Sequence, residues 1–209
     1  MTMSGPAAPS RRPRARRGEG ERLRDDILHA ATELLIRVGD ADAVSIRAVA
    51  EAVGVTPPSI YLHFADKTAL MFQVCQQQWD RFNEHLRAAV DGIDDPIKWL
   101  ETAGHTYIQW GLDNQEHYRI LFMSKPSDVP DNIDKQEVIM SGVWGDVLAV
   151  AQRAVDEGLL VGDPALIGFT AWAAAHGLTS LLISCPDMPW PDVHQLSRSV
   201  LDRTLQRPL

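Results

Sequence analysis

The sequence predicts an all-α protein, in which a small N-terminal domain of three helices precedes a larger helical domain. Apolar residues recur three or four positions apart in one segment after another, and no segment shows the alternation of a β-strand. Between these segments stand Gly, Pro, Asp and Asn residues of the kind that begin and end helices. The 209 residues are 45% hydrophobic and 23% charged, which is typical of a soluble globular chain with a sizeable core.

The first 20 residues are expected to be disordered, because they are rich in Pro, Ser, Ala and Arg and have no hydrophobic periodicity. Within them, residues 11–17 read RRPRARR and place five arginines in seven positions. One interpretation is a flexible arm that binds DNA phosphates or the minor groove through Arg14, Arg16 and Arg17. The other is a leader segment that only adds solubility.

Three helices follow the arm. The first, over residues 21–38, has a stripe of apolar side chains and is stopped by Gly39. The second begins after Ser45, a good N-cap, and ends at Gly54, which supplies the backbone freedom of a tight turn. The third is capped by Thr56 and has two prolines in its first turn, where an N–H group has no helical partner. The last two helices have the layout of a helix-turn-helix, whose second helix enters the major groove of DNA.

The same segment carries a pattern more specific than that of a generic helix pair. Residues 50–56 read AEAVGVT, and residues 60–67 read IYLHFADK. Together they resemble the DNA-binding domain of TetR-type transcriptional regulators. The resemblance implies that residues 21–66 form a three-helix, helix-turn-helix DNA-binding domain. The alternative is an ordinary helical hairpin with a core of Ala and Val.

Residues 56 to 61 should face the groove in this arrangement. The hydroxyl groups of Thr56 and Ser59 can bond a phosphate or a base edge, and the two prolines between them can pack against thymine methyl groups. The resemblance implies phosphate contacts for Tyr61, His63 and Lys67, although Tyr61 could instead be a core aromatic and His63 could cap a turn. The predicted DNA-binding residues of the domain are Arg47, Thr56, Pro57, Pro58, Ser59, Tyr61, His63 and Lys67.

Residues 67–209 are expected to form the larger domain, which the resemblance implies binds a ligand and dimerises. Asp66 caps a long helix that continues to about Val90. Further helices are expected over residues 97–113, around 118–122, and over 135–157, 164–184 and 192–206, with a loop at 125–134.

Residues 165–185 contain no Asp, Glu, Lys or Arg over 21 positions, which is long enough for a membrane span. Glycines and polar residues dilute the segment, however, and no Lys or Arg cluster flanks it. A helix that is apolar all round can equally be buried between partners. We therefore expect a homodimer through residues 164–184 and 192–206, and no membrane contact. The residues expected at this four-helix interface are Gly168, Ala171, Ala175, Gly177, Val193, Leu196, Val200, Leu201 and Leu205.

A second resemblance lies in this part of the chain. Residues 172–177 read WAAAHG, and W-x-x-x-H-G is a signature of the C-terminal domain in one group of TetR-type regulators. Residues 107–123, which end in YRILFM, resemble the same group. Gln115 stands where that group commonly has a proline, so the start of the short helix near residue 118 is expected to differ. The resemblance identifies a scaffold and leaves its ligand open.

The same helices are rich in aromatic residues, which line most drug-sized pockets together with a few polar groups. We therefore predict a pocket for a small apolar or aromatic effector. Many of these side chains could instead serve only to fill the core. The predicted effector-binding residues are Trp79, Phe82, Trp99, His105, Tyr107, Trp110, Tyr118, Phe122, Trp144, Trp172 and His176.

The net charge of −8 is unevenly distributed along the chain. Residues 1–67 carry 10 Lys and Arg against 9 Asp and Glu, whereas residues 68–209 carry 10 against 19. A DNA-facing end joined to an acidic body would show such an asymmetry. The chain has two cysteines without ligand spacing and no apolar leader, so we expect a protein of the reducing cytoplasm.

Enzymatic activity is not expected. The chain has no G-x-S-x-G, P-loop or G-x-G-x-x-G motif, and its histidines and cysteines lack metal-ligand spacing. We therefore predict no cofactor and no metal. The function that remains is that of a DNA-binding transcription regulator, a homodimeric repressor that a small effector releases from a near-palindromic operator. An activator of the same family and a helical membrane-associated adaptor are the alternatives.

Overall fold

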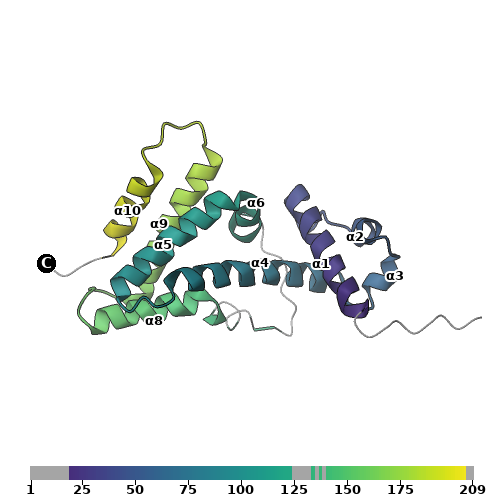
Figure 1. Ribbon diagram of the computed structural model, residues 1–209, viewed down its shortest axis with the longest axis horizontal. Helices are drawn as coiled ribbons and strands as arrows, with labels where there is room; N and C mark the ends of the chain where they lie inside the picture. Colours follow the sequence, from purple (N-terminus) through teal and green to yellow (C-terminus); the bar gives the residue numbers. More distant parts are fainter. Residues whose placement is uncertain (1–18, 124–132, 135–136, 138–139, 206–209) are drawn as a thin grey trace, which may run out of the picture.

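The computed structural model describes residues 19–123, 133–134, 137 and 140–205. Over these residues the chain is helical and has no strand, so the prediction of an all-α fold is confirmed. The arginine-rich segment with Arg14, Arg16 and Arg17, and most of the expected loop at 125–134, lie outside the described residues. The helices form two units joined by one long helix (Figure 1).

The N-terminal unit consists of α1 (Glu19–Val38), α2 (Ile46–Val53) and α3 (Pro57–Ile60). Ser45 begins α2 as expected, since its Oγ accepts a hydrogen bond from the Ala48 N–H at 3.1 Å. Gly54 ends α2 with a φ of 75°, a left-handed conformation that favours glycine. Local chemistry therefore fixes both ends of α2, and with them the turn that leads into α3.

One apolar core holds these three helices together. Its most deeply buried side chains include Ile27, Leu28, Val49, Ile60 and Phe64. Ile60 and Phe64 stand four positions apart, so one side of the α3 segment faces the core and the other is left to solvent. Burying one such side chain contributes about 1.5–3 kcal/mol relative to leaving it exposed. This burial holds α3 in place although it is only one turn long.

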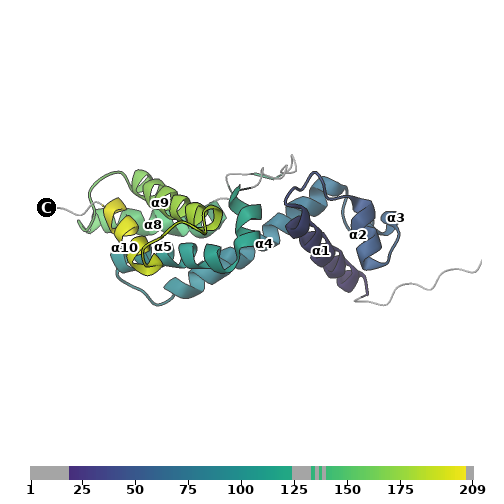
Figure 2. The same ribbon diagram turned by 90° about the horizontal axis from the view of Figure 1, so that it is seen from above.

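The long helix α4 (Lys67–Val90) belongs to both units (Figure 2). Asp66 caps it by accepting a hydrogen bond from the Ala69 N–H at 2.7 Å. Its first turns contribute Leu70 to the N-terminal core, whereas Phe82 belongs to the C-terminal core. At a rise of 1.5 Å per residue its 24 residues extend for about 36 Å, so α4 is a stiff connection between the two cores.

The C-terminal unit is a helical bundle with α9 at its centre. Its elements are α5 (Pro96–Asp113), α6 (Gln115–Tyr118), η1 (Arg119–Met123), α8 (Val143–Asp156), α9 (Pro164–Ser184) and α10 (Val193–Thr204). α9 packs against α5, α8 and α10, and α4 packs against α5. The starts of α5, α9 and α10 lie close to their predicted positions, because Asp95, Asp163 and Asp192 each cap the helix that follows.

One helix of this bundle is interrupted where the sequence predicts a continuous one. A helix is expected over residues 135–157, and Glu137, Met140 and Ser141 are helical, but the helix breaks at Gly142 and α8 begins at Val143. The Val143 N–H donates to Oδ1 of Asn83 at 3.1 Å, and Asp146 in the first turn binds Nε of Arg87 at 2.7 Å. Both partners lie on α4, so the start of α8 is capped from another helix. A cap from so far along the chain leaves no local signal in the sequence.

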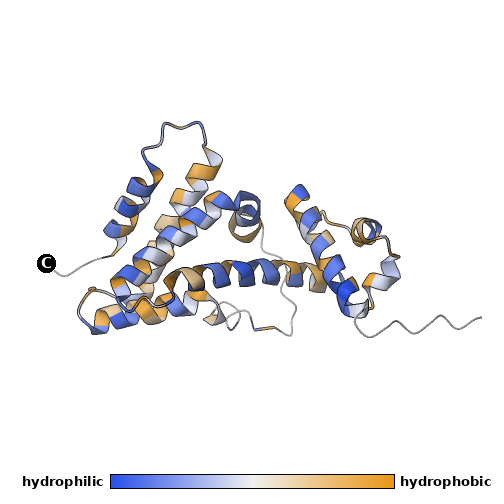
Figure 3. Cartoon of the chain, in the orientation of Figure 1, coloured by the Kyte–Doolittle hydropathy of each residue, from blue (hydrophilic) through white to orange (hydrophobic). Residues whose placement is uncertain are grey.

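Among the described helices, α9 alone is long and apolar enough to cross a membrane, judged by length and composition. Hydrophobic and neutral residues run along its length (Figure 3). Its buried residues, which include Ile167, Leu178 and Leu182, pack into the core of the same chain. The core helix of a soluble protein passes the same test, so this composition is weak evidence for a membrane span.

Part of the predicted dimer interface is buried inside the chain instead. Leu201 and Leu205 of α10 are 2% and 5% exposed and belong to the C-terminal core. Gly168 and Ala175 of α9 are also buried by helices of the same chain. The prediction that these four residues lie between subunits is therefore wrong. Apolar periodicity predicts that a residue is buried, but it does not tell whether its own chain or a partner buries it.

Candidate functional site

The short helix α3 lies at the end of the molecule far from the C-terminal unit (Figures 1 and 2). Thr56, Pro57 and Pro58 at its start are exposed. Ile60 in its last position is fully buried, which orients the helix with its first turn toward solvent. The elements expected to enter the major groove are therefore free to do so.

The hydroxyl groups of Thr56 and Ser59 bond to each other, with 3.0 Å between their oxygen atoms. Thr56 occupies the N-cap position with an extended backbone, but its side chain accepts no hydrogen bond from the backbone of α3. The predicted cap is thus right in position and different in its bonding. One hydroxyl of the pair keeps a free O–H, which can donate to a phosphate or a base edge.

Tyr61 and Leu62 continue the exposed edge beyond α3. Tyr61 is 51% exposed, so it is a surface residue and not a core aromatic. Leu62 is 83% exposed and was not among the predicted contacts. Its position midway between Ile60 and Phe64, the two residues that face the core, could have identified it. Together the two side chains offer a phenol O–H for a phosphate and an apolar group for a sugar or methyl group.

The other predicted DNA contacts are Arg47, His63 and Lys67. Arg47 is exposed on α2. Lys67 is partly buried, and its Nζ donates to the carbonyl oxygen of Asp42 at 2.6 Å. Lys67 therefore closes the loop between α1 and α2, in addition to the phosphate contact that is predicted for it. His63 is also partly buried, and its ring lies beside Gly20 near the start of α1.

The predicted effector residues gather in the C-terminal unit. Five aromatic rings from α4, α5 and η1 pack against one another, mostly edge to face. They belong to Trp79, Phe82, Tyr107, Trp110 and Phe122. The ring centroids of Phe82 and Trp110 are 4.9 Å apart, and those of Phe82 and Tyr107 are 5.6 Å apart. Each such pair contributes about 0.5–1.5 kcal/mol beyond the burial of its surface. An effector can enter between these rings only by displacing one of them.

A polar triad adjoins this cluster. Oη of Tyr118 lies 2.7 Å from Nδ1 of His176, and Oη of Tyr107 lies 3.2 Å from the same nitrogen. Burial raises the pKa of both phenols and lowers the pKa of the imidazole, so all three groups are neutral near pH 7. A neutral imidazole that accepts at Nδ1 carries its proton on Nε2. No described residue accepts a hydrogen bond from this Nε2–H, which leaves it available to a ligand.

A second group of rings leads from the triad to the surface. Trp144 of α8 packs against Phe169 and Trp172 of α9, with ring centroids 4.7 and 5.8 Å away. The ring of Trp172 in turn lies 6.1 Å from that of His176. Phe169 and Trp172 are 51% and 41% exposed. The imidazole is therefore connected by ring contacts to two aromatic residues that are partly exposed to solvent.

Two of the predicted effector residues lie outside this connected network of rings. Nδ1 of His105 bonds to Oγ of Ser197 at 3.0 Å and so links α5 to α10. Trp99 is buried in the C-terminal core and makes no ring contact within the described part of the chain. Phe169 belongs to the network but was not predicted. Its spacing of three positions before Trp172 on an apolar helix is the signal that could have found it.

The short segment from Tyr118 to Phe122 contacts both cores. Tyr118 and Phe122 belong to the effector network, whereas Ile120 between them is 8% exposed and packs in the N-terminal core. The segment includes η1, a π-helical turn, which is a geometry often found at functional sites. It connects the candidate effector site to the N-terminal core, on which the helix-turn-helix is packed.

Both the N-terminal and the C-terminal unit match models of known protein families. Residues 27–74 match the model of the tetR family of bacterial regulatory proteins. Residues 100–204, which are half of the chain, match the model of the Tetracyclin repressor-like C-terminal domain. The assignment of the W-x-x-x-H-G signature to one group within the family stays a prediction.

One curated relative is the HTH-type transcriptional activator FasR of Mycolicibacterium smegmatis. It is 27% identical to this chain over 117 residues. The match covers 54% of this chain and 53% of FasR, so it spans about half the length of that relative.

Solved structures share the fold over nearly the whole chain. A TetR family transcription regulator from Marinobacter aquaeolei VT8 has a TM-score of 0.64 at 17% identity, over 90% of this chain and 97% of that one. AibR, solved in complex with isovaleryl coenzyme A and operator DNA, has a TM-score of 0.68 at 19% identity, over 89% and 100%. With family models matching both its helix-turn-helix and its C-terminal bundle, the chain belongs to the TetR family and is a DNA-binding transcription regulator.

Proposed function

We propose that the protein is a cytoplasmic homodimer that represses transcription from a near-palindromic operator and leaves it when a small apolar or aromatic effector binds. The observation that carries the effector proposal is the environment of His176. Its Nε2–H has no acceptor in the described chain, its ring adjoins the exposed Trp172, and its Nδ1 bonds tyrosines from two other elements.

The proposed dimer forms through the exposed side of α9. Leu166, Ala173, Gly177 and Leu181 follow one another there at helical spacing, and Leu166 and Leu181 are 66% and 51% exposed. Apart from its own helix backbone, a Cβ at Gly177 would meet no atom of the described residues within 4 Å, although a glycine inside a helix costs about 1 kcal/mol relative to alanine. No contact in the described part of the subunit requires a glycine at this position. The close approach of a partner helix would require one.

A dimer of this kind sets the geometry of the operator. In a two-fold interface the same surface of both subunits meets, so the two α3 helices are related by the same axis. To reach successive major grooves on one side of DNA they must stand about 34–36 Å apart. The operator is then near-palindromic, with half-sites one helical turn apart.

The triad defines what the effector must offer. Its apolar or planar part would stack on Trp144, Phe169 and Trp172. A hydroxyl or carbonyl oxygen would accept from Nε2–H of His176, since that donor is neutral and unpaired in the described chain. A purely apolar molecule would leave this N–H without a partner and would bind less tightly.

The segment 118–122 supplies the link to DNA. An effector that displaces Tyr118 or Phe122 also shifts Ile120, which lies in the N-terminal core. A ligand acts only through a difference in affinity between two shapes of the protein. Such coupling is typically about 1–3 kcal/mol, and the operator must weaken effector binding by the same factor.

The test combines operator selection with a compound screen. Selection from random DNA gives the operator, and small aromatic and apolar compounds are then screened by quenching of tryptophan fluorescence. Each compound that binds should weaken operator binding in a fluorescence anisotropy assay and should lose affinity for a His176→Phe variant. His194→Phe, an exposed histidine of α10, is the matched control. If compounds bind the His176→Phe variant as tightly as the wild type, the effector site does not include His176. If compounds bind but leave operator affinity unchanged, release by an effector is disproved.

An activator is the second candidate, because the curated relative FasR is a transcriptional activator. A reporter gene behind the selected operator distinguishes the two. Deletion of the regulator raises reporter expression if it represses and lowers expression if it activates.

A further inference from the structure

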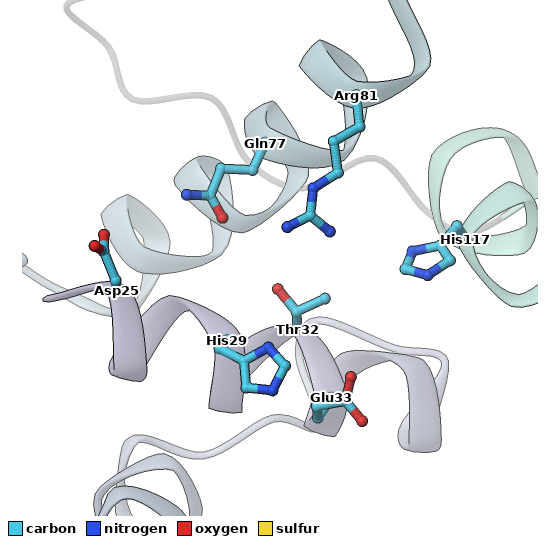
Figure 4. A pocket seen from close by; sticks show the side chains of 7 residues that line it. All are labelled: Asp25, His29, Thr32, Glu33, Gln77, Arg81 and His117. Carbon is cyan, nitrogen blue, oxygen red and sulfur yellow. The ribbon is translucent and has the colours of Figure 1, made fainter. Parts of the chain in front are cut away.

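A polar cavity of about 390 Å³ lies between α1 on one side and α4 with α6 on the other (Figure 4). It is separate from the effector network, since none of the rings of that network lines it. The side chains on the α1 wall are Asp25, His29, Thr32 and Glu33, and those on the opposite wall are Gln77, Arg81 and His117.

The charged side chains of this cavity are exposed to solvent and are not paired with one another. Within the described residues, Asp25, Glu33 and Arg81 form no hydrogen bond and no ion pair, although they line the same space. Nδ1 of His117 is buried and has no hydrogen-bond partner in this part of the chain. Figure 4 shows the guanidinium of Arg81 and the ring of His117 directed into the cavity. A ligand that bonds to Nδ1 of His117 would remove the cost of this buried unpaired atom, whereas the exposed charges are available to a ligand in exchange for water.

The two walls differ in charge. α1 presents two carboxylates, whereas α4 presents a guanidinium and an amide. A ligand with a single charge would be attracted by one wall and repelled by the other, but a ligand with both charges is attracted by both. A guanidinium is suited to a carboxylate, which it can bind with two parallel hydrogen bonds. No group of three His, Cys, Asp or Glu side chains among the described residues is placed to hold a metal ion, which favours an organic ligand.

We propose that this cavity binds a small dipolar molecule of the amino-acid class, with its carboxylate on Arg81 and Gln77 and its ammonium group on a carboxylate of α1. Two positions are available to the ammonium group. Asp25 and Glu33 stand eight positions apart on α1, which corresponds to about 12 Å along the helix. The distance between the two charges of the ligand therefore selects which carboxylate it uses.

The test is isothermal titration calorimetry on the full chain without DNA, so that its outcome does not depend on the operator or on the effector site. The probes are the twenty common L-amino acids and a length series of glycine, 3-aminopropanoate, 4-aminobutyrate and 6-aminohexanoate. Butylamine and butanoate are the comparators with a single charge. We expect saturable binding of at least one dipolar probe, with the two comparators at least about tenfold weaker.

Charge-neutral variants assign the site. Arg81→Gln should weaken binding of the tightest-binding probe at least about tenfold. Either Glu33→Gln or Asp25→Asn should weaken it as much, and the length of the probe decides which of the two does so. Arg37→Gln and Asp26→Asn remove exposed charges of α1 outside the cavity and should leave binding unchanged. The absence of saturable binding by every dipolar probe would overturn the proposal. Equal binding of a comparator, or binding that survives Arg81→Gln, would overturn it as well.

Discussion

Replacing Gly177 with alanine distinguishes an effect on the stability of the subunit from an effect on the affinity of the proposed dimer. Among the described residues of the subunit, the new methyl group meets no atom outside its own helix backbone within 4 Å, and the helix gains about 1 kcal/mol from the better helix former. Between subunits the same methyl group enters the surface where the two copies of α9 would meet. Overpacking by one such group costs about 1–3 kcal/mol, and a two-fold interface receives it twice. The dimer should therefore weaken by about 2–6 kcal/mol, which is roughly 30-fold or more in its dissociation constant.

Gly111→Ala is the matched control, because it is the same substitution inside another helix. There a Cβ would lie 2.5 Å from Cγ2 of Thr179 and 2.8 Å from Cδ2 of Tyr118, both fully buried side chains of the same subunit. Gly111→Ala should therefore lower the thermal stability of the fold, whereas Gly177→Ala should lower only the dimer affinity. Sedimentation velocity over a dilution series measures the dissociation constant, and circular dichroism measures helix content. A Gly177→Ala protein whose dimer affinity equals that of the wild type would refute the assignment of this surface.

Three further predictions follow from the contacts described. Lys67→Ala should weaken binding to all DNA sequences alike and reduce the slope of log affinity against log salt by about one. Tyr61→Phe should weaken binding without changing that slope. Fluorescence anisotropy over a range of salt concentrations measures both. Because burial lowers the pKa of His176 below its ordinary 6.5, its contribution to stability is complete above pH 6.5 and declines as the pH falls below that value. The melting temperature should therefore fall between pH 7 and pH 5 more steeply in the wild type than in His176→Phe; equal slopes would contradict this. Ile120→Ala should lower the stability of the N-terminal domain by about 2–5 kcal/mol. Calorimetry should show that the variant still binds the effector. Anisotropy should show that the bound effector no longer weakens operator binding.

Most helix boundaries could be predicted because the groups that set them are close in sequence. Asp66 caps α4 through the N–H of Ala69, and Ser45 caps α2 through the N–H of Ala48. The start of α8 could not be predicted in this way, since its cap is Asn83 of α4. A hydrogen bond between distant segments depends on how the helices pack, and no local pattern reports it.

The packing of the aromatic residues could be predicted in part, whereas their role in binding an effector stays a prediction. Aromatic residues on neighbouring helices were correctly expected to meet, because apolar stripes of a bundle face one another. His105 was grouped with them, but its side of α5 faces Ser197 of α10. The same is true of Leu201. The apolar periodicity of its helix predicts that it is buried, but not whether its own chain or a partner covers it. The residue type and its spacing fix a helix face, whereas the neighbour of that face is fixed only by the fold.

The segment from Tyr118 to Phe122 divides the effector network into a side that can change and a side that cannot. Trp144, Phe169 and Trp172 do not belong to the N-terminal core in the described chain, and Trp172 meets the segment only through His176. Under the proposed function, substitutions at Trp144 and Phe169 should therefore act on recognition more than on output. Under the proposed function, a change within the segment would also move Ile120 and so alter output together with recognition. If the proposed effector site holds, a library for a new inducer should vary the α8 and α9 side and keep the segment fixed. Such a library would change the compound that is recognised and leave the link to DNA unchanged.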